Sequence, residues 1–302
     1  MILIVFIGKV EGSMQESYVK VNDVNLHYVT EGEGELMLFL HGFPYFWYNW
    51  HHQMEEFSKD YQVVAVDMRG YNLSDKPEEV SSYEMSILVE DVKQLIEAFG
   101  EKNCILVAHD WGGAIAWTLA YTEPDYVKQL IMFDAPHPYT FRRELKENPG
   151  QREASSYMGF FQRPDAHDKL LENNAERLRN MMTEPGKEKG YLTEAEEQKY
   201  VEAWMQPDAM KSMLHYYRAV SFYPFEEHIK KPLDLPYQMF DSPTLIIWGD
   251  ADPAFENSNL DGVEDYVRDL TIHRMEGVSH APHHEQPETV NRYMREFLGE
   301  KK

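Results

Sequence analysis

The sequence predicts an α/β fold: an eight-stranded, mostly parallel sheet with helices on both faces and an inserted helical lid. Two observations favour it. Short apolar runs alternate with helical patterns along most of the chain, and helix-like residues interrupt this alternation once, between residues 137 and 236. A length of 302 residues suits one large domain that carries such an insert.

Eight short β-branched and apolar runs are predicted as strands. The first two lie close together, as an antiparallel pair does, whereas the later runs alternate with helical patterns such as residues 84–99 and 287–298. This alternation predicts parallel pairing with helices on both faces of the sheet. The predicted strands are residues 18–21, 24–30, 36–40, 63–67, 104–108, 130–134, 244–248 and 270–275.

The insert, residues 137–236, is rich in Met, Tyr and Phe and is punctuated by prolines. Because it follows the sixth predicted strand, we expect it to cover the carboxyl ends of the strands, where open α/β folds bind their ligands. The core is then formed by residues 14–136 and 237–302. Residues 1–13 resemble a leader or a tag, since Gly12 and Ser13 precede Met14.

The composition narrows the classes of partner. A formal net charge of -23, from 29 basic and 52 acidic residues, opposes binding to nucleic acid or to anionic membranes and favours a neutral or cationic small molecule. The only cysteine, Cys104, excludes an intramolecular disulfide and fits a reducing compartment. We therefore expect a cytoplasmic protein without a stable membrane anchor. The apolar residues 1–7 leave secretion open, and the choice between monomer and homodimer also stays open.

The most informative motif is His109-Asp110-Trp111-Gly112-Gly113, between an apolar run and a helix-like stretch. This strand, sharp turn and helix are typical of a nucleophile elbow, in which the apex side chain stands above the sheet. The apex here is Asp110. A carboxylate nucleophile displaces a leaving group from a saturated carbon and becomes an alkyl ester. An isolated motif of this kind would more often be a helix cap, so the assignment depends on its partners.

A second motif, His41-Gly42-Phe43-Pro44, directly follows the third predicted strand. A bend at this point turns backbone N–H groups toward the elbow. We expect the amides of Phe43 and Trp111 to form an oxyanion hole. His41, Pro44 and His109, which flank these two turns, are expected to contact the substrate.

The remaining catalytic groups are predicted in the loops after the last two strands. Asp252 follows the seventh strand and His280 follows the eighth, so the chain order is nucleophile, acid, histidine, as in α/β-hydrolase triads. Other residues compete for these roles. Asp250, in the first loop, competes for the acid, and His273, within the eighth strand, competes for the base together with His283 and His284.

His280, His283, His284 and Glu285 lie close together in the sequence, as the ligands of a metal site can. Their spacing matches no standard zinc signature, and no distant Cys or His pair completes it. We expect neither a metal at this cluster nor a cofactor.

From residue 18 to its C-terminus, the chain resembles the α/β-hydrolases of the epoxide hydrolase and haloalkane dehalogenase branch. Besides the motifs above, residues 66–71 (VDMRGY), with Ser74 and Pro77, are similar to that family's loop after the fourth strand. The resemblance implies the α/β-hydrolase fold. It also implies Asp110 as nucleophile, His280 as the base that activates water, and Asp252 as the acid that orients it.

The resemblance further implies two lid tyrosines that hold an epoxide oxygen. The segments 157–164 (YMGFFQRP) and 215–218 (HYYR) resemble the family's tyrosine segments and give this role to Tyr157 and Tyr217, with Tyr216 as the nearest competitor. The expected substrates are a small apolar epoxide and water, and the expected product is a vicinal diol.

Other functions remain as alternatives. A haloalkane or haloacid dehalogenase would use the same nucleophile, but Phe43 stands where haloalkane dehalogenases typically have Asn, and Trp111 and Ala114 occupy the region in which fluoroacetate dehalogenases carry arginines. A non-catalytic binding protein and a serine esterase fit less well. The chain departs from the family pattern at two positions. Tyr45 stands where many relatives have a Glu that could help to order water, and Asn72 stands where a Gly is frequent.

Overall fold

The computed structural model describes residues 14–220, 223–230, 235–236 and 238–299, so the leader-like residues 1–13 lie outside the described residues. An eight-stranded sheet has the order β1-β2-β4-β3-β5-β6-β7-β8. The pairs β1-β2 and β2-β4 are antiparallel and the other pairs are parallel, which confirms the predicted fold class. The strands are β1 (Gln15–Val21), β2 (Val24–Glu31), β3 (Leu36–Leu40), β4 (Gln62–Val66), β5 (Cys104–His109), β6 (Val127–Phe133), β7 (Thr244–Gly249) and β8 (Leu270–Met275).

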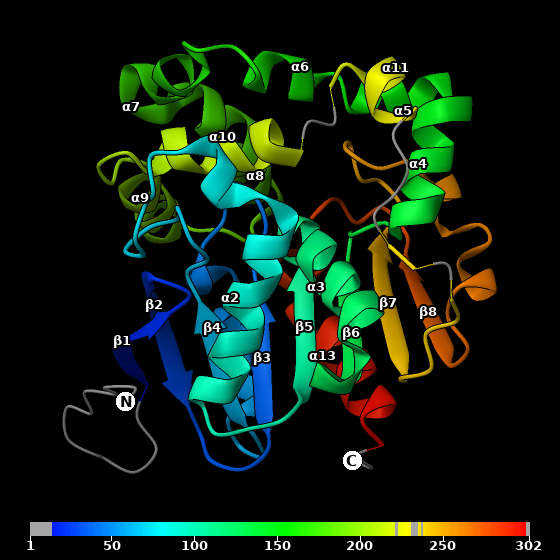
Figure 1. Ribbon diagram of the computed structural model, residues 1–302. Coiled ribbons are helices and arrows are strands. Elements are labelled where there is room, and N and C mark those ends of the chain that lie inside the picture. Colours follow the sequence, from blue (N-terminus) through cyan, green and yellow to red (C-terminus); the bar gives the residue numbers. More distant parts are fainter. Residues whose placement is uncertain (1–13, 221–222, 231–234, 237, 300–302) are drawn as a thin grey trace.

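Helices cover both faces of the sheet (Figure 1). The central strand β3 is fully buried, and its side chains alternate between two apolar clusters. Leu36, Leu38 and Leu40 pack with residues of α2 and α3, whereas Met37 and Phe39 pack with residues of α1 and α13. These helices are α1 (His51–Phe57), α2 (Met85–Ala98), α3 (Asp110–Thr122) and α13 (Pro287–Phe297).

The strand limits differ most from the prediction at β6, which begins at Val127 rather than at residue 130. Its first residues mix buried and exposed side chains, including the exposed Lys128, so the apolar run starts later than the strand. The same reason applies to β1, which begins at Gln15 and has several exposed side chains. Backbone pairing, rather than side-chain burial, sets these ends.

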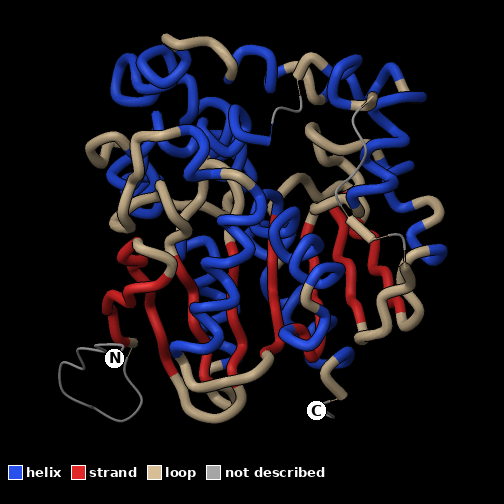
Figure 2. Tube along the Cα trace, viewed as in Figure 1, coloured by secondary structure: helices blue, strands red, loops and turns tan. Residues whose placement is uncertain are grey.

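The predicted insert falls between β6 and β7. Its helices lie beyond the carboxyl ends of the parallel strands, on the side where β5 meets α3 (Figures 1 and 2). We call these helices the helical insert; that residues 137–236 form a separate subdomain stays a prediction. They are α4 (Pro138–Glu147), α5 (Pro149–Ala154), α6 (Tyr157–Phe161), α7 (Ala166–Met182), α8 (Glu184–Lys189), α9 (Glu194–Trp204), α10 (Ala209–Val220) and α11 (Phe225–His228).

Short elements complete the loops around the sheet. They are the α-helix α12 (Pro282–Glu285) and the 3-10 helices η1 (Trp47–Trp50), η2 (Val80–Tyr83), η3 (Pro124–Tyr126), η4 (Asn257–Leu260) and η5 (Val263–Asp265). Among the residues that the structure describes, none belongs to a helix with the length and hydropathy that a bilayer crossing requires.

Candidate active site

Asp110 stands at the sharp turn between β5 and α3. Its φ is +51°, in the left-handed region that a non-glycine residue adopts only when its surroundings enforce it. The two glycines that follow permit the close packing of this turn. A Cβ on Gly112 would lie 2.4 Å from the carbonyl oxygen of Leu40, and one on Gly113 would lie 2.2 Å from the Cβ of Ala135. The two glycines are therefore a steric requirement of the elbow.

Two backbone amides hold the Asp110 carboxylate. The N–H of Phe43 donates to Oδ1 over 2.7 Å, and the N–H of Trp111 also donates to this carboxylate. The turn after β3 brings the Phe43 amide into place. This close approach requires a glycine at position 42, because a Cβ there would lie 2.3 Å from the Cβ of Asp110. The structure thus places both predicted oxyanion-hole amides on the predicted nucleophile.

His280 lies between two carboxylates. Its Nδ1 is 2.7 Å from Oδ2 of Asp252, and its Nε2 is 3.8 Å from Oδ2 of Asp110. The Asp252 side chain is fully buried, and its Oδ1 accepts the backbone N–H groups of Ala254 and Phe255 at 2.7 and 3.3 Å. These bonds fix the carboxylate that in turn orients the imidazole.

The electrostatics of the three groups are coupled. Burial raises the pKa of Asp110 above its usual value, although His280 and the two amides favour the carboxylate. For His280, burial opposes the charged form, but the carboxylates of Asp252 and Asp110 outweigh it and raise the pKa to about 9. At neutral pH the free protein therefore favours the imidazolium form of His280.

The competing residues of the two loops lie elsewhere. Asp250 accepts a backbone N–H from the loop after β8 in an exposed turn, and His273 stacks on an aromatic ring of α13. His283 and His284 are buried and hydrogen-bonded to other side chains. Among these acidic and histidine side chains and the predicted pair, only His280 and Asp252 form a pair that reaches Asp110.

The two predicted tyrosines approach from the helical insert. Tyr157, on α6, and Tyr217, on α10, line one cavity with Asp110, and their rings meet edge-on with centroids 6.1 Å apart. The Trp111 indole N–H donates to the Tyr217 hydroxyl. Burial raises the pKa of both tyrosines, so both keep their protons near neutral pH. Tyr216 points away, and its hydroxyl donates to the carbonyl oxygen of Arg69 over 2.8 Å.

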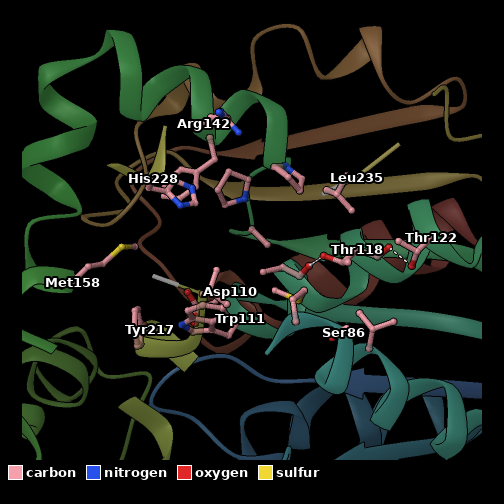
Figure 3. A pocket seen from close by; sticks show the side chains of 18 of the residues that line it. Ser86, Asp110, Trp111, Thr118, Thr122, Arg142, Met158, Tyr217, His228 and Leu235 are labelled. Atoms are coloured by element: carbon pink, nitrogen blue, oxygen red, sulfur yellow. Dashed lines mark hydrogen bonds between the residues drawn. The ribbon is translucent and has the colours of Figure 1, made fainter. Parts of the chain in front are cut away.

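The cavity has a volume of about 530 Å³. Figure 3 shows Asp110 and Trp111 of α3 close to Tyr217 of α10, with Thr118 and Thr122 farther along α3. Most of its wall is apolar, as expected for a small-molecule site with a few converging polar groups. Apolar and aromatic residues of the wall include Met85, Val89, Ala114, Pro136, Phe141, Met158, Val220 and Phe255.

The family model described as "alpha/beta hydrolase fold" matches residues 35–288. The chain belongs to this family. The match confirms the resemblance that the motifs indicate, and it places the elbow, the oxyanion turn and the His280 loop inside the shared region.

This α/β-hydrolase is similar to curated proteins named epoxide hydrolases. It is 37% identical to epoxide hydrolase 4 of Mus musculus, over 94% of this chain and 79% of that protein, and 36% identical to epoxide hydrolase 1 of Caenorhabditis elegans, over 93% and 69%. A solved Bacillus megaterium epoxide hydrolase in complex with an inhibitor is 48% identical, with a TM-score of 0.90 over 94% of this chain and 100% of that one.

The three residues expected to contact the substrate, His41, Pro44 and His109, do not face the cavity. All three are buried and are not among the described residues that line the cavity. His41 Nε2 accepts the backbone N–H of Met68 at 3.1 Å, and the Pro44 carbonyl accepts the Trp204 indole N–H at 2.6 Å. His109 donates from Nε2 to the backbone carbonyl of the predicted base over 2.7 Å. These bonds direct each group into the protein.

Sequence reasoning missed two buried polar residues beside the triad. Asp134, at the carboxyl end of β6, accepts the N–H of Gly249 over 2.9 Å, and burial together with Asp252 raises its pKa well above the usual value. Gln151, on α5, donates to the carbonyl of Ala254 over 2.9 Å and so ties the helical insert to the loop after β7. Only the position of Asp134 at a strand end offered a signal in the sequence.

Tyr45, which replaces a frequent Glu, also lies near the triad. Its ring contacts the rings of His109 and Tyr200, with centroids 5.4 and 5.9 Å away. Burial, Tyr191 and Asp110 raise its pKa well above the usual value. This position therefore presents a neutral hydroxyl instead of a carboxylate.

Proposed function

We propose that this hydrolase is an epoxide hydrolase, which converts epoxides to vicinal diols through an ester on Asp110. One observation carries the proposal: the hydroxyls of Tyr157 and Tyr217 share a cavity with the Asp110 carboxylate. A nucleophile and two O–H donors in one apolar site suit a substrate whose leaving oxygen stays attached to the attacked molecule. The names of the relatives support the same activity.

In the first step, Asp110 attacks one epoxide carbon and the carbon–oxygen bond of the ring breaks. Oδ2 is the attacking atom in this scheme, because Oδ1 accepts the Phe43 amide. The ring oxygen gains negative charge as the bond breaks, and it takes a proton from the hydroxyl of one of the two tyrosines, Tyr157 or Tyr217, while the other donates a hydrogen bond. These donors act most strongly on charge that develops in the transition state.

In the second step, water hydrolyses the ester. Esterification removes the negative charge of Asp110, so the pKa of His280 falls and its imidazolium releases a proton to solvent. The neutral imidazole can then take a proton from the attacking water, and His280 regains the solvent proton when the Asp110 carboxylate forms again. The hydroxide attacks the Asp110 carboxyl carbon, and the amides of Phe43 and Trp111 stabilise the oxyanion.

Collapse of this intermediate completes the cycle. The ester C–O bond breaks, the leaving diol oxygen takes the proton from His280, and the new Asp110 carboxyl proton returns to the tyrosinate. The net reaction is the addition of one water to the epoxide to give the diol. Side chains and amides of this chain carry out every step, so the scheme requires no cofactor.

Epoxides that carry an apolar group fit the site best. The cavity of about 530 Å³ lies within the size range of drug-sized ligand sites, and its wall is mainly apolar. A mutant of the Bacillus megaterium epoxide hydrolase, 48% identical with a TM-score of 0.91, was solved with its product (R)-3-[1]naphthyloxy-propane-1,2-diol. An aryloxy epoxide is therefore a suitable probe.

Halide release from a haloalkane is the alternative reaction of the same nucleophile. A halide needs N–H donors at the site. The Trp111 indole N–H already donates to Tyr217, and Phe43 offers no side-chain donor. These observations favour an epoxide oxygen over a halide as the leaving group.

The test compares the two reactions with one enzyme preparation. Naphthyl glycidyl ether is expected to yield its diol, whereas 1-bromobutane is expected to release no bromide above the background. Asp110→Ala is the control and is expected to remove the diol-forming activity. Bromide release without diol formation would overturn the assignment of the leaving group, and an unchanged rate in Asp110→Ala would overturn the nucleophile.

The cytoplasmic location stays a prediction. It rests on the single cysteine, Cys104, which is buried within β5. Cell fractionation of the native host would test it.

A further inference from the structure

We propose that His51, His52 and Glu196 form a binding site for one Zn²⁺ ion between the sheet domain and the helical insert. His51 and His52 open α1, and Glu196 lies in the first turn of α9. One ligand atom from each residue lies within 4.8 Å of the other two. Nε2 of His51 is 3.6 Å from Oε1 of Glu196. None of the three is a proposed catalytic residue.

The His51 ring is oriented as a metal ligand requires. Its Nδ1 donates to the backbone carbonyl of Tyr48 over 2.8 Å, which leaves the lone pair on Nε2, the atom that faces Glu196. The ring also stacks on that of Tyr48, with centroids 4.2 Å apart and planes 3° from parallel. Metal-binding histidines commonly use the second ring nitrogen in this way, and the bond fixes both tautomer and orientation.

The Glu196 carboxylate is fixed in a similar way. Its Oε2 accepts the backbone N–H and the hydroxyl of Thr193 at 2.8 and 2.7 Å, as part of the capping box that begins α9. This anchoring leaves Oε1 directed at His51. The His51 and Glu196 side chains are each 16% exposed, so an ion can reach them while most of the site is shielded from water.

The protonation states at neutral pH suit a cation. Burial lowers the pKa of His51 to about 4 and also lowers that of His52, so both imidazoles are neutral. For Glu196, burial favours the neutral acid, but the hydrogen bonds from Thr193 outweigh it and lower the pKa. By its geometry, the site offers two imidazole nitrogens and one carboxylate oxygen as ligands.

This ligand set favours Zn²⁺ over Mg²⁺ and Ca²⁺, which prefer sites made of oxygen ligands. Bonds of about 2.0–2.2 Å place tetrahedral zinc ligands roughly 3.3–3.6 Å apart. The 3.6 Å separation between His51 and Glu196 already meets this condition, and the His52 ligand atom lies within 4.8 Å of both. Water can supply the fourth ligand.

A bound ion would join α1, which packs on the sheet, to α9 of the helical insert. The His284 ring lies next to the site, with its centroid 5.5 Å from that of His51, but its Nε2 is hydrogen-bonded to the Tyr200 hydroxyl at 3.0 Å. Because a ligand that binds only the folded state stabilises it, Zn²⁺ should raise the melting temperature.

The test uses tag-free, EDTA-treated and dialysed full-length protein, titrated calorimetrically with ZnCl₂ and, separately, with MgCl₂. One Zn²⁺ per chain is expected, with no measurable Mg²⁺ binding. Co²⁺ should bind with the strong visible absorption of a four-coordinate site. A zinc-dependent rise of the melting temperature gives an independent readout.

Two variants remove ligands while they preserve local structure. Glu196→Gln keeps a capping box, which accepts Gln at this position, and His51→Phe keeps the stack on Tyr48. Each should weaken Zn²⁺ binding by about tenfold or more, by comparison with losses around other metal sites. His273→Gln, a histidine on β8 far from α9 in the chain, is the control and should bind zinc like the parent.

The absence of zinc binding, or equal affinity in the parent and both ligand variants, would overturn the proposal. Circular dichroism of each variant establishes that it is folded before the titration. Epoxide turnover is measured separately without zinc. A protein that binds no zinc can therefore still support the proposed activity, and a protein without epoxide turnover can still bind zinc.

Discussion

Nδ1 of His280 lies 2.7 Å from the buried carboxylate of Asp252. The opposite ring nitrogen lies 3.8 Å from Asp110, so the imidazole has a carboxylate on each side. This arrangement stabilises the imidazolium, which cannot act as a base. In the proposed cycle the ester on Asp110 removes one of the two charges. The base therefore becomes available only when there is an ester to hydrolyse.

The first prediction concerns the titration of His280. Its pKa should be about 9 in the free enzyme and should fall in Asp110→Ala, because one of the two attracting carboxylates is lost. NMR titration of the histidine ring signals measures both values. A pKa that stays the same in the variant would contradict the proposed coupling.

The same pKa has a consequence for stability. Because the folded pKa exceeds the usual value of 6.5, the stabilisation from the His280 imidazolium is fully present below pH 6.5 and is lost as the pH rises through about 9. Between these values, the free energy of unfolding should fall less steeply with pH in His280→Gln than in the parent. Denaturant titrations across this range give the comparison, and equal slopes would argue against the raised pKa.

The second prediction separates the two acidic residues of the loop after β7. Asp252→Asn should slow turnover by about 10²- to 10⁴-fold, because the amide no longer orients the imidazole or stabilises its charge. Asp250→Asn is the matched control and should remain near the parent rate, since Asp250 accepts a backbone N–H in an exposed turn. Steady-state diol formation measures both, and similar losses in the two variants would count against Asp252.

The third prediction concerns the division of labour between nucleophile and base. His280→Gln should still be alkylated by the epoxide but should not hydrolyse the ester, so about one equivalent of adduct should accumulate. Intact-protein mass spectrometry detects the added mass of the substrate. His273→Gln, which replaces a histidine stacked on α13, should turn over normally without adduct. Full turnover by His280→Gln would exclude it as the base.

The fourth prediction concerns the tyrosines. Tyr157→Phe and Tyr217→Phe should each slow alkylation on the order of ten- to a thousand-fold, as the loss of one oxyanion donor does. Tyr216→Phe should keep its alkylation rate while it loses about 1 kcal/mol of stability with the hydrogen bond to Arg69. Stopped-flow fluorescence of the alkylation phase makes the comparison. Unchanged rates in both cavity variants would reject their role.

The sequence was sufficient to predict the sheet and the strand–turn–helix at Asp110, because each has a local signature. The elbow is one such case: Gly112 and Gly113 are required by contacts that any strand–turn–helix of this kind makes. The ends of β1 and β6 were less accessible, since partly exposed residues there pair through their backbones. Local patterns report burial better than they report hydrogen bonding.

The direction of individual side chains could not be read from the motifs. His41 and His109 adjoin the two predicted turns, but hydrogen bonds direct both into the protein. Asp134 and Gln151 were not found because their partners are distant in the chain and meet them only in the fold. Adjacent tyrosines on α10 differ by about 100° in direction, so only the fold shows that Tyr217 faces the cavity.

The most direct test of the ester mechanism is a single turnover of an aryloxy epoxide in oxygen-18 water with excess enzyme. We predict that the label enters the Asp110 carboxylate, detected by mass analysis of the peptide that contains it, while the first diol formed carries unlabelled oxygen from the enzyme. Diol that contains the label, with an unlabelled Asp110 peptide, would show direct attack of water on the epoxide and would contradict the account.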